Sequence, residues 1–190
     1  MLAAGLGVVS IAVALPASAS TAVEPAAPHA AMFVPSALAV PGIAPSDADE
    51  TAVYLDSTGR VMPRATGPDG ATQRALIGCT PFSGKDNPHW SDPDVSGHGY
   101  WDKGTCSNNR ANVYNCLYEF YTDNTWRQKA CSPVEELAPG GGSANRTVAR
   151  VRCADRTNTS WRNHVDVDVI GEIDTGETPH NQAIVDCRVY

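Results

Sequence analysis

The sequence is short of basic residues, with 14 Lys and Arg against 21 Asp and Glu and a formal net charge of −7 at pH 7. Proteins that bind nucleic acids neutralise backbone phosphates with an excess of Lys and Arg. Because this chain has no such excess, we expect no nucleic-acid partner.

Motifs of common catalytic and cofactor sites are missing as well. The chain has no Gly-x-Ser-x-Gly, no His-Glu-x-x-His and no phosphate-binding P-loop motif. It also lacks Cys-x-x-Cys, which argues against a zinc ribbon or a thiol redox site. We therefore assign no catalytic residue, expect no metal and no cofactor, and favour a binding protein over an enzyme.

The N-terminal stretch has the features of a secretory signal peptide. Met1 to Val23 carries no charge, Leu2 to Leu15 is apolar, and Ala17-Ser18-Ala19 has the small residues of a cleavage site. The usual basic start is missing, and an uncleaved anchor is the alternative, but Pro16 and the short apolar run argue against it. We predict a signal peptide over residues 1–19 and a secreted, extracellular protein with no stable membrane insertion after cleavage.

Six cysteines are present, and in an exported chain they predict three disulfides. If all six are paired, no cysteine remains as a nucleophile. Many connectivities are possible, and sequential pairing is the simplest: Cys79–Cys106, Cys116–Cys131 and Cys153–Cys187.

The stretch from Val113 to Cys131 predicts a β-hairpin. Its first half is dense in aromatic and β-branched residues, and Asp123-Asn124 suits a two-residue turn. That turn would place Tyr121 opposite Trp126, Leu117 opposite Ala130 and Cys116 opposite Cys131. Directly opposed residues are close enough for a disulfide, so the register itself supports the Cys116–Cys131 pair.

The composition changes near Ala75. Residues 20–75 are rich in Ala and Pro and have no sustained helix or strand period, so we interpret them as a disordered linker or pro-segment. Inside this segment, Val53-Tyr54-Leu55 and Val61-Met62 flank a turn sequence and could form a weak hairpin. The disulfide-stabilised β domain is expected over residues 76–190.

Further strand patterns recur in this domain. Alternation over Val95–Cys106 places Val95, Gly97, Gly99 and Trp101 on one face, and His98, Tyr100 and Asp102 on the other. Residues 81–93 are expected to form a loop. Strands are also expected at Leu76–Cys79 and Ile184–Tyr190.

A second strand pairing is predicted between Arg146–Cys153 and Val165–Glu172. One register sets three arginines opposite three acidic residues on one face and apolar residues opposite each other on the other face. These elements predict a small antiparallel β-sandwich, with an immunoglobulin-like architecture possible and a small closed barrel as the alternative. The opposed charges are Arg152 with Asp166, Arg150 with Asp168, and Arg146 with Glu172.

Four segments carry a resemblance to a known group: His98–Cys106, Asn115–Arg127, Pro139–Arg146 and Ser160–Asp168. They resemble uncharacterised exported bacterial proteins with a small disulfide-bonded β domain, and the likeness covers roughly Cys79 to Tyr190. The resemblance implies secretion and a compact disulfide domain. It implies no catalytic residues.

Two sets of side chains are candidates for binding. Aromatic residues exposed together could line a sugar or peptide groove, although tryptophans more often pack in a core. His164, Asp166 and Asp168 share one strand face and could bind a cation with Glu172 or Asp174, although a salt-bridge ladder with the arginines is favoured. The aromatic candidates are Trp90, Tyr100, Trp101, Trp126 and Trp161.

We thus expect a secreted β-sandwich that works by binding an extracellular protein or a cell-envelope glycan. One alternative is a small secreted hydrolase that uses His98 with a nearby carboxylate such as Asp102 or Glu119. Another is a secreted inhibitor or effector acting through the Gly140–Asn145 loop.

Overall fold

The computed structural model describes residues 35–62, 78–173 and 179–190, and the predicted signal peptide lies outside them. The predicted Leu76–Cys79 strand is only partly described, and its described residues, Gly78 and Cys79, are not in a strand. The elements are α1 (Ala48–Thr51), β1 (Val53–Leu55), β2 (Phe82–Lys85), β3 (His89–Ser91), β4 (Asp94–Asp102), β5 (Ala111–Tyr121), β6 (Thr125–Cys131), β7 (Glu135–Leu137), β8 (Thr147–Arg152), β9 (Asp155–Val169) and β10 (His180–Arg188).

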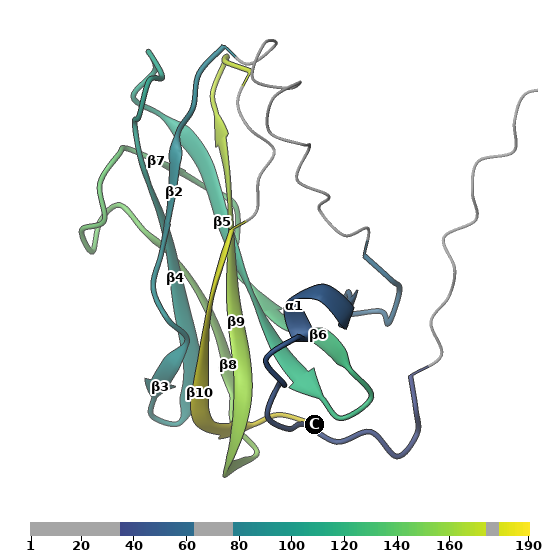
Figure 1. The fold of residues 1–190 in the computed structure, drawn as a ribbon. Coiled ribbons are helices and arrows are strands. Elements are labelled where there is room, and N and C mark those ends of the chain that lie inside the picture. Colours follow the sequence, from purple (N-terminus) through teal and green to yellow (C-terminus); the bar gives the residue numbers. More distant parts are fainter. Residues whose placement is uncertain (1–34, 63–77, 174–178) are drawn as a thin grey trace, which may run out of the picture.

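The strands form two sheets packed face to face (Figure 1). The first has the order β1-β6-β5-β9-β10, with β7 pairing β5, and the second has the order β2-β4-β3, with β8 pairing β4. Leu117 and Trp161 of the first sheet join Val95 and Ala149 of the second in one buried cluster. The predicted all-β sandwich is confirmed, and β1 and β6 form a parallel pair within it.

Glycines in β4 let the sheets approach closely, and the predicted alternation of this strand is confirmed. A Cβ atom at Gly97 would lie 2.7 Å from the Asn163 side chain, and one at Gly99 would lie 2.9 Å from Thr147 Oγ1. The Asn115 side-chain amide takes the space between the sheets and donates to the Gly97 carbonyl and to Asn163 Oδ1 at 2.9 and 2.8 Å. A polar network therefore replaces apolar packing at the centre of the sandwich.

The central hairpin is confirmed, with one error in its register. Cys116 faces Cys131 and Leu117 faces Ala130, but Tyr121 faces Thr125 rather than Trp126. The turn contains three residues instead of two, ending at Asn124 with a φ of 60°, and a bulge after Leu117 corrects the shift. Three-residue hairpin loops commonly end with a residue in the left-handed backbone conformation, as Asn124 does here.

The second predicted pairing is wrong. β8 pairs with β4, so Arg152 faces Asp94 and Arg150 faces Ser96, whereas residues 165–169 of β9 pair with β5. Both β4 and β9 carry acidic residues, so matching opposite charges along the sequence did not identify the partner of β8. Arg150 forms its ion pair with Asp94 of β4 at 3.7 Å. The loop expected over residues 81–93 likewise contains the short strands β2 and β3.

All three sequential disulfides are present: Cys79–Cys106, Cys116–Cys131 and Cys153–Cys187. They indicate an oxidising environment for the folded domain. Among the described residues, no helix has both the length and the apolar character needed to cross a bilayer.

Residues 35–62 pack on the first sheet instead of forming a free linker before Ala75. Pro41 bridges Tyr121, and the Gly42 N–H donates to the Phe120 carbonyl at 2.9 Å. The expected turn between Val53–Leu55 and Val61 is present as an antiparallel bridge between Leu55 and Val61. The physical reason is that the outer face of β5 is aromatic and needs a cover, which α1 and β1 supply beside β6 (Figure 1).

Candidate functional site

A cavity of about 430 Å³ opens where residues 35–62 meet the outer face of the first sheet. We call it the aromatic pocket and define it by six of its lining residues. α1 and β1 contribute two of them, β5 one, and the neighbouring strands β9 and β10 the other three, which alternation along each strand points outward. The six residues are Asp49, Tyr54, Tyr118, Arg162, His164 and His180.

Aromatic rings form a continuous wall of the pocket. The Tyr54 and Tyr118 ring centroids lie 5.4 Å apart in an edge-to-face arrangement, and His164 contacts both at 5.1 and 4.9 Å. His180, directly opposite His164 in the β9–β10 ladder, stacks on it at 4.7 Å with 23° between the rings. Such contacts hold the rings rigid, so their faces are preorganised.

Arg162 is the central charge of the pocket and is only 2% exposed. Its guanidinium lies over the Trp126 ring, 4.1 Å from the centroid. It donates hydrogen bonds to Asp49 and to the Tyr54 hydroxyl, and to Gln182 Oε1 at 2.9 Å. Each of the three guanidinium nitrogens of Arg162 therefore already donates one hydrogen bond within the protein.

Two ionisable groups of the wall, His180 and Tyr118, are held in their neutral forms. Burial lowers the pKa of His180, and the nearby Arg162 and Lys85 charges act in the same direction, against the opposing effect of Asp49. Burial likewise raises the pKa of Tyr118, with Tyr114 and Tyr54 adding to it. The pocket thus offers a neutral hydroxyl and a neutral imidazole beside the Arg162–Asp49 ion pair and the Asp166 carboxylate.

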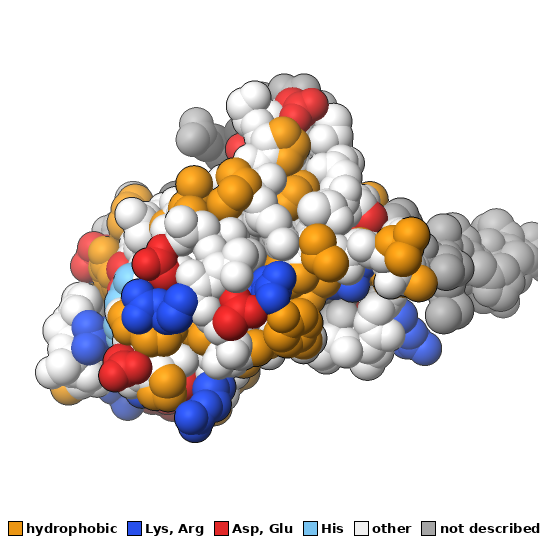
Figure 2. Space-filling model, turned by 90° about the horizontal axis from the view of Figure 1, so that it is seen from below, with side chains coloured by type: hydrophobic (Ala, Val, Ile, Leu, Met, Phe, Trp, Pro, Cys, Tyr) orange, Lys and Arg blue, Asp and Glu red, His pale blue; other side chains and the backbone are white. Residues whose placement is uncertain are grey.

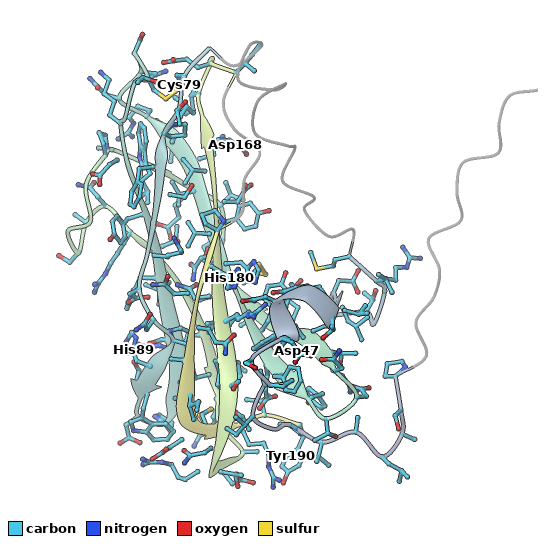
Figure 3. All side chains as sticks on the ribbon, viewed as in Figure 1. Asp47, Cys79, His89, Asp168, His180 and Tyr190 are labelled. Atoms are coloured by element: carbon cyan, nitrogen blue, oxygen red, sulfur yellow. A yellow bond between two sulfur atoms is a disulfide. The ribbon has the colours of Figure 1, made fainter. Side chains whose placement is uncertain are left out.

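A second cluster lies at β3 and β4 of the second sheet, where Figure 3 labels His89. We call Asp86, His89 and His98 the histidine cluster. Between the Lys85–Gly99 and His89–Ser96 pairs, three residues (86–88) lie opposite only two residues of β4 (97–98). The backbone therefore bulges here and turns Asp86 toward His98. Asp86 Oδ2 lies 2.5 Å from His98 Nδ1 and 3.8 Å from His89 Nδ1.

The predicted aromatic binding residues do not gather in one groove. Trp101, Trp126 and Trp161 have no exposed surface and belong to three different core clusters. Trp90 and Tyr100 are half-buried on the second sheet, and Arg156 lies over the Trp90 ring at 4.0 Å. Three of the five therefore pack in the core, the alternative reading that the sequence left open.

The histidine and carboxylate candidates are arranged differently from the sequence-based expectation. His98 meets Asp86 rather than Asp102 or Glu119. Glu119 is fully buried beside Lys129 at 3.6 Å, and burial raises its pKa to about 7.

His164 and Asp166 do share a strand face and line the aromatic pocket, whereas Asp168 is exposed. Tyr54, Arg162 and His180 were missed in sequence. The sequence shows only the local setting of two of them. Tyr54 lies in the predicted weak hairpin, and His180 lies in a polar stretch before the predicted last strand.

Comparison with known proteins finds no similarity: no family model matches the chain, and neither a curated protein nor a solved structure does.

Proposed function

We propose that this is an exported binding protein whose aromatic pocket holds a sugar unit of a cell-envelope glycan. The observation that carries the proposal is the combination of rigid ring faces with neutral hydrogen-bonding groups in one cavity. A sugar presents apolar C–H faces and a rim of hydroxyls, and both complement such a wall. The cavity volume of about 430 Å³ falls within the usual range for small-ligand sites.

The charges of the pocket disfavour an anionic ligand. The Asp49 and Asp166 carboxylates line the cavity and would repel an anion, and Arg162 is already paired with Asp49. A quaternary ammonium ligand suits aromatic walls, so tetramethylammonium is the competing ligand in the test. A neutral sugar needs no ionic partner.

The surface favours a small ligand over a broad protein partner. The large exposed hydrophobic side chains of the strands come from different strands: Phe82 of β2, Val148 of β8 and Ile184 of β10. On the face seen in Figure 2, hydrophobic side chains are interspersed with charged ones. Protein interfaces more often have a contiguous apolar centre.

The test is calorimetric titration of the full chain with neutral and N-acetylated oligosaccharides and with cell-wall glycan fragments. We expect Tyr54→Ala to weaken binding at least about tenfold, because it removes a ring face at the centre of the wall. Tyr54→Phe keeps that face and should change affinity less than about threefold. Phe82→Ala, on an exposed aromatic outside the pocket, is the matched control.

Equal binding by the wild type and Tyr54→Ala would contradict the proposal. So would saturable binding of tetramethylammonium in place of any sugar, which would instead identify the pocket as a cation cage.

A further inference from the structure

The histidine cluster offers three metal-ligand atoms at close range. Asp86 Oδ2, a ring nitrogen of His89 and one of His98 all lie within 4.8 Å of one another. Asp86 comes from the β2–β3 connection, His89 from the start of β3 and His98 from the middle of β4. Two imidazoles and one carboxylate are a ligand set that suits Zn²⁺.

Surrounding groups fix the orientation of these ligands. Asp86 Oδ1 accepts from the His98 backbone N–H at 2.6 Å, and the Asp86 carbonyl accepts from the Asn163 amide at 3.2 Å. His89 Nε2 lies 3.2 Å from Ser96 Oγ, which lies 2.6 Å from Ser91 Oγ. Metal-binding histidines commonly have such a partner on the second ring nitrogen, because it fixes the tautomer.

The carboxylate is also available to a cation. In the described part of the chain, Asp86 forms ion pairs with His89 and His98 and with no Lys or Arg. The side chains of His89 and Asp86 are 43% and 37% exposed, so solvent can reach the cluster. The His98 side chain is only 12% exposed, because it lies in the middle of β4 within the second sheet.

We propose that Asp86, His89 and His98 bind one Zn²⁺, with solvent completing the coordination. The Asn87 carbonyl lies 2.9 Å from His89 Nδ1, so the metal-free ring carries its proton on Nδ1. On binding, Zn²⁺ displaces the Asn87 carbonyl from His89 Nδ1 and the hydrogen bond between His98 Nδ1 and Asp86. In each ring the proton passes through solvent to Nε2, and that of His89 is then donated to Ser96 Oγ. Three protein ligands and an open position are the arrangement of reactive rather than purely structural zinc sites.

This site is separate from the aromatic pocket and does not depend on sugar binding. The test is calorimetric titration of the untagged full chain with ZnCl₂. We expect one equivalent to bind, and we expect His98→Asn and His89→Asn each to abolish this binding. Ser96→Ala, which removes only the partner of His89 Nε2, should weaken binding by about 10- to 100-fold.

His180→Asn is the matched control, because His180 also stacks on a histidine and lies 3.6 Å from an aspartate. It should bind Zn²⁺ as the wild type does. Long-range ¹H–¹⁵N spectra should show the ring nitrogens of His89 and His98 shifting on zinc addition, with those of His164 and His180 unchanged. This readout uses the wild type and so does not depend on how any variant folds.

Absence of binding by the wild type would overturn the proposal, as would unchanged affinity in His89→Asn. Loss of binding in His180→Asn would place the metal in the aromatic pocket and would overturn it equally.

Discussion

The molecule contains two stacked histidine pairs that are alike in geometry and differ in their surroundings. His89 and His98 stack at 5.4 Å, His164 and His180 stack at 4.7 Å, and both pairs have 23° between the rings. Each pair has an aspartate beside it. Asp86 is paired with histidines alone among the described residues, whereas Asp49 is engaged by the buried Arg162.

The difference shows that a neighbouring cation decides what a His–Asp group can do. An arginine supplies a permanent positive charge that neutralises its aspartate. Burial lowers the pKa of the nearby His180 imidazole, and the arginine adds to this effect. Without arginine, the carboxylate and the imidazoles keep their capacity for a divalent cation. Under the two proposals above, one pair therefore serves a neutral ligand and the other serves zinc.

Both sites depend on one strand. Successive residues of β9 point to opposite faces, so Arg162 and His164 line the aromatic pocket while Asn163 points inward to Asp86 and His98. Substitutions on β9 can therefore separate the two sites.

The largest effect is expected for Asn163→Ala. The Asn163 side chain is fully buried, donates to the Asp86 and His98 carbonyls and accepts from Asn115. Removing it takes one donor from each of these carbonyls and the acceptor from Asn115, so we expect the free energy of unfolding to fall by about 2–3 kcal/mol in urea titrations. Sugar binding should be unchanged, and zinc affinity should fall.

The control for this prediction is Asn181→Ala, whose half-buried amide donates to the Lys85 carbonyl at 3.2 Å. It should lower the free energy of unfolding by less than about 1 kcal/mol. Equal effects of the two substitutions would show that the inward network does not position the Asp86 turn.

Arg162→Met is expected to change the free energy of unfolding less than Asn163→Ala does, but to change the number of zinc ions bound. Methionine keeps apolar contact with Trp126 and removes the charge, so the free energy of unfolding should change by no more than about 1–2 kcal/mol. Asp49 would lose its arginine partner, and we expect a weak second zinc equivalent at His180 and His164.

Arg188→Met is the control for this second site, because it breaks the ion pair with Asp155 far from any histidine pair. It should leave the stoichiometry at the wild-type value. If Arg162→Met also binds no additional zinc, a free aspartate is not what distinguishes the two pairs.

The smallest effect is expected for His180→Gln, and its sign is informative. The folded-state pKa of His180 is lowered, so the unfolded chain takes up the proton first as the pH falls below about 6.5. Wild-type stability should fall through this window, relative to the Gln variant, and then level off below the folded-state pKa. The measurement is urea unfolding of both proteins between neutral and acidic pH.

The opposite trend would mean that Asp49 raises the pKa of His180. In that case Asp49 would act on the protonation of His180 more strongly than Arg162 does, and the two histidine pairs would no longer differ in this respect.

Local patterns in the sequence were sufficient for several features. Alternation in β4, the aromatic density of β5 and the spacing of Cys116 and Cys131 depend on contacts within a strand or across one turn. The hairpin register failed by one residue near Asn124 because a two-residue and a three-residue loop fit the same composition. The partner of β8 failed because acidic residues on several strands can match its arginines.

By itself, the sequence determined the all-β class, the central hairpin and its Cys116–Cys131 disulfide, since these follow from side-chain period and from pairing across one turn. Only the tertiary structure decided which groups meet at the two histidine pairs. Asp49 reaches Arg162 across 113 positions, and Asp86 reaches Asn163 across 77. Such contacts depend on how sheets and covering segments pack, and no local pattern encodes that distance.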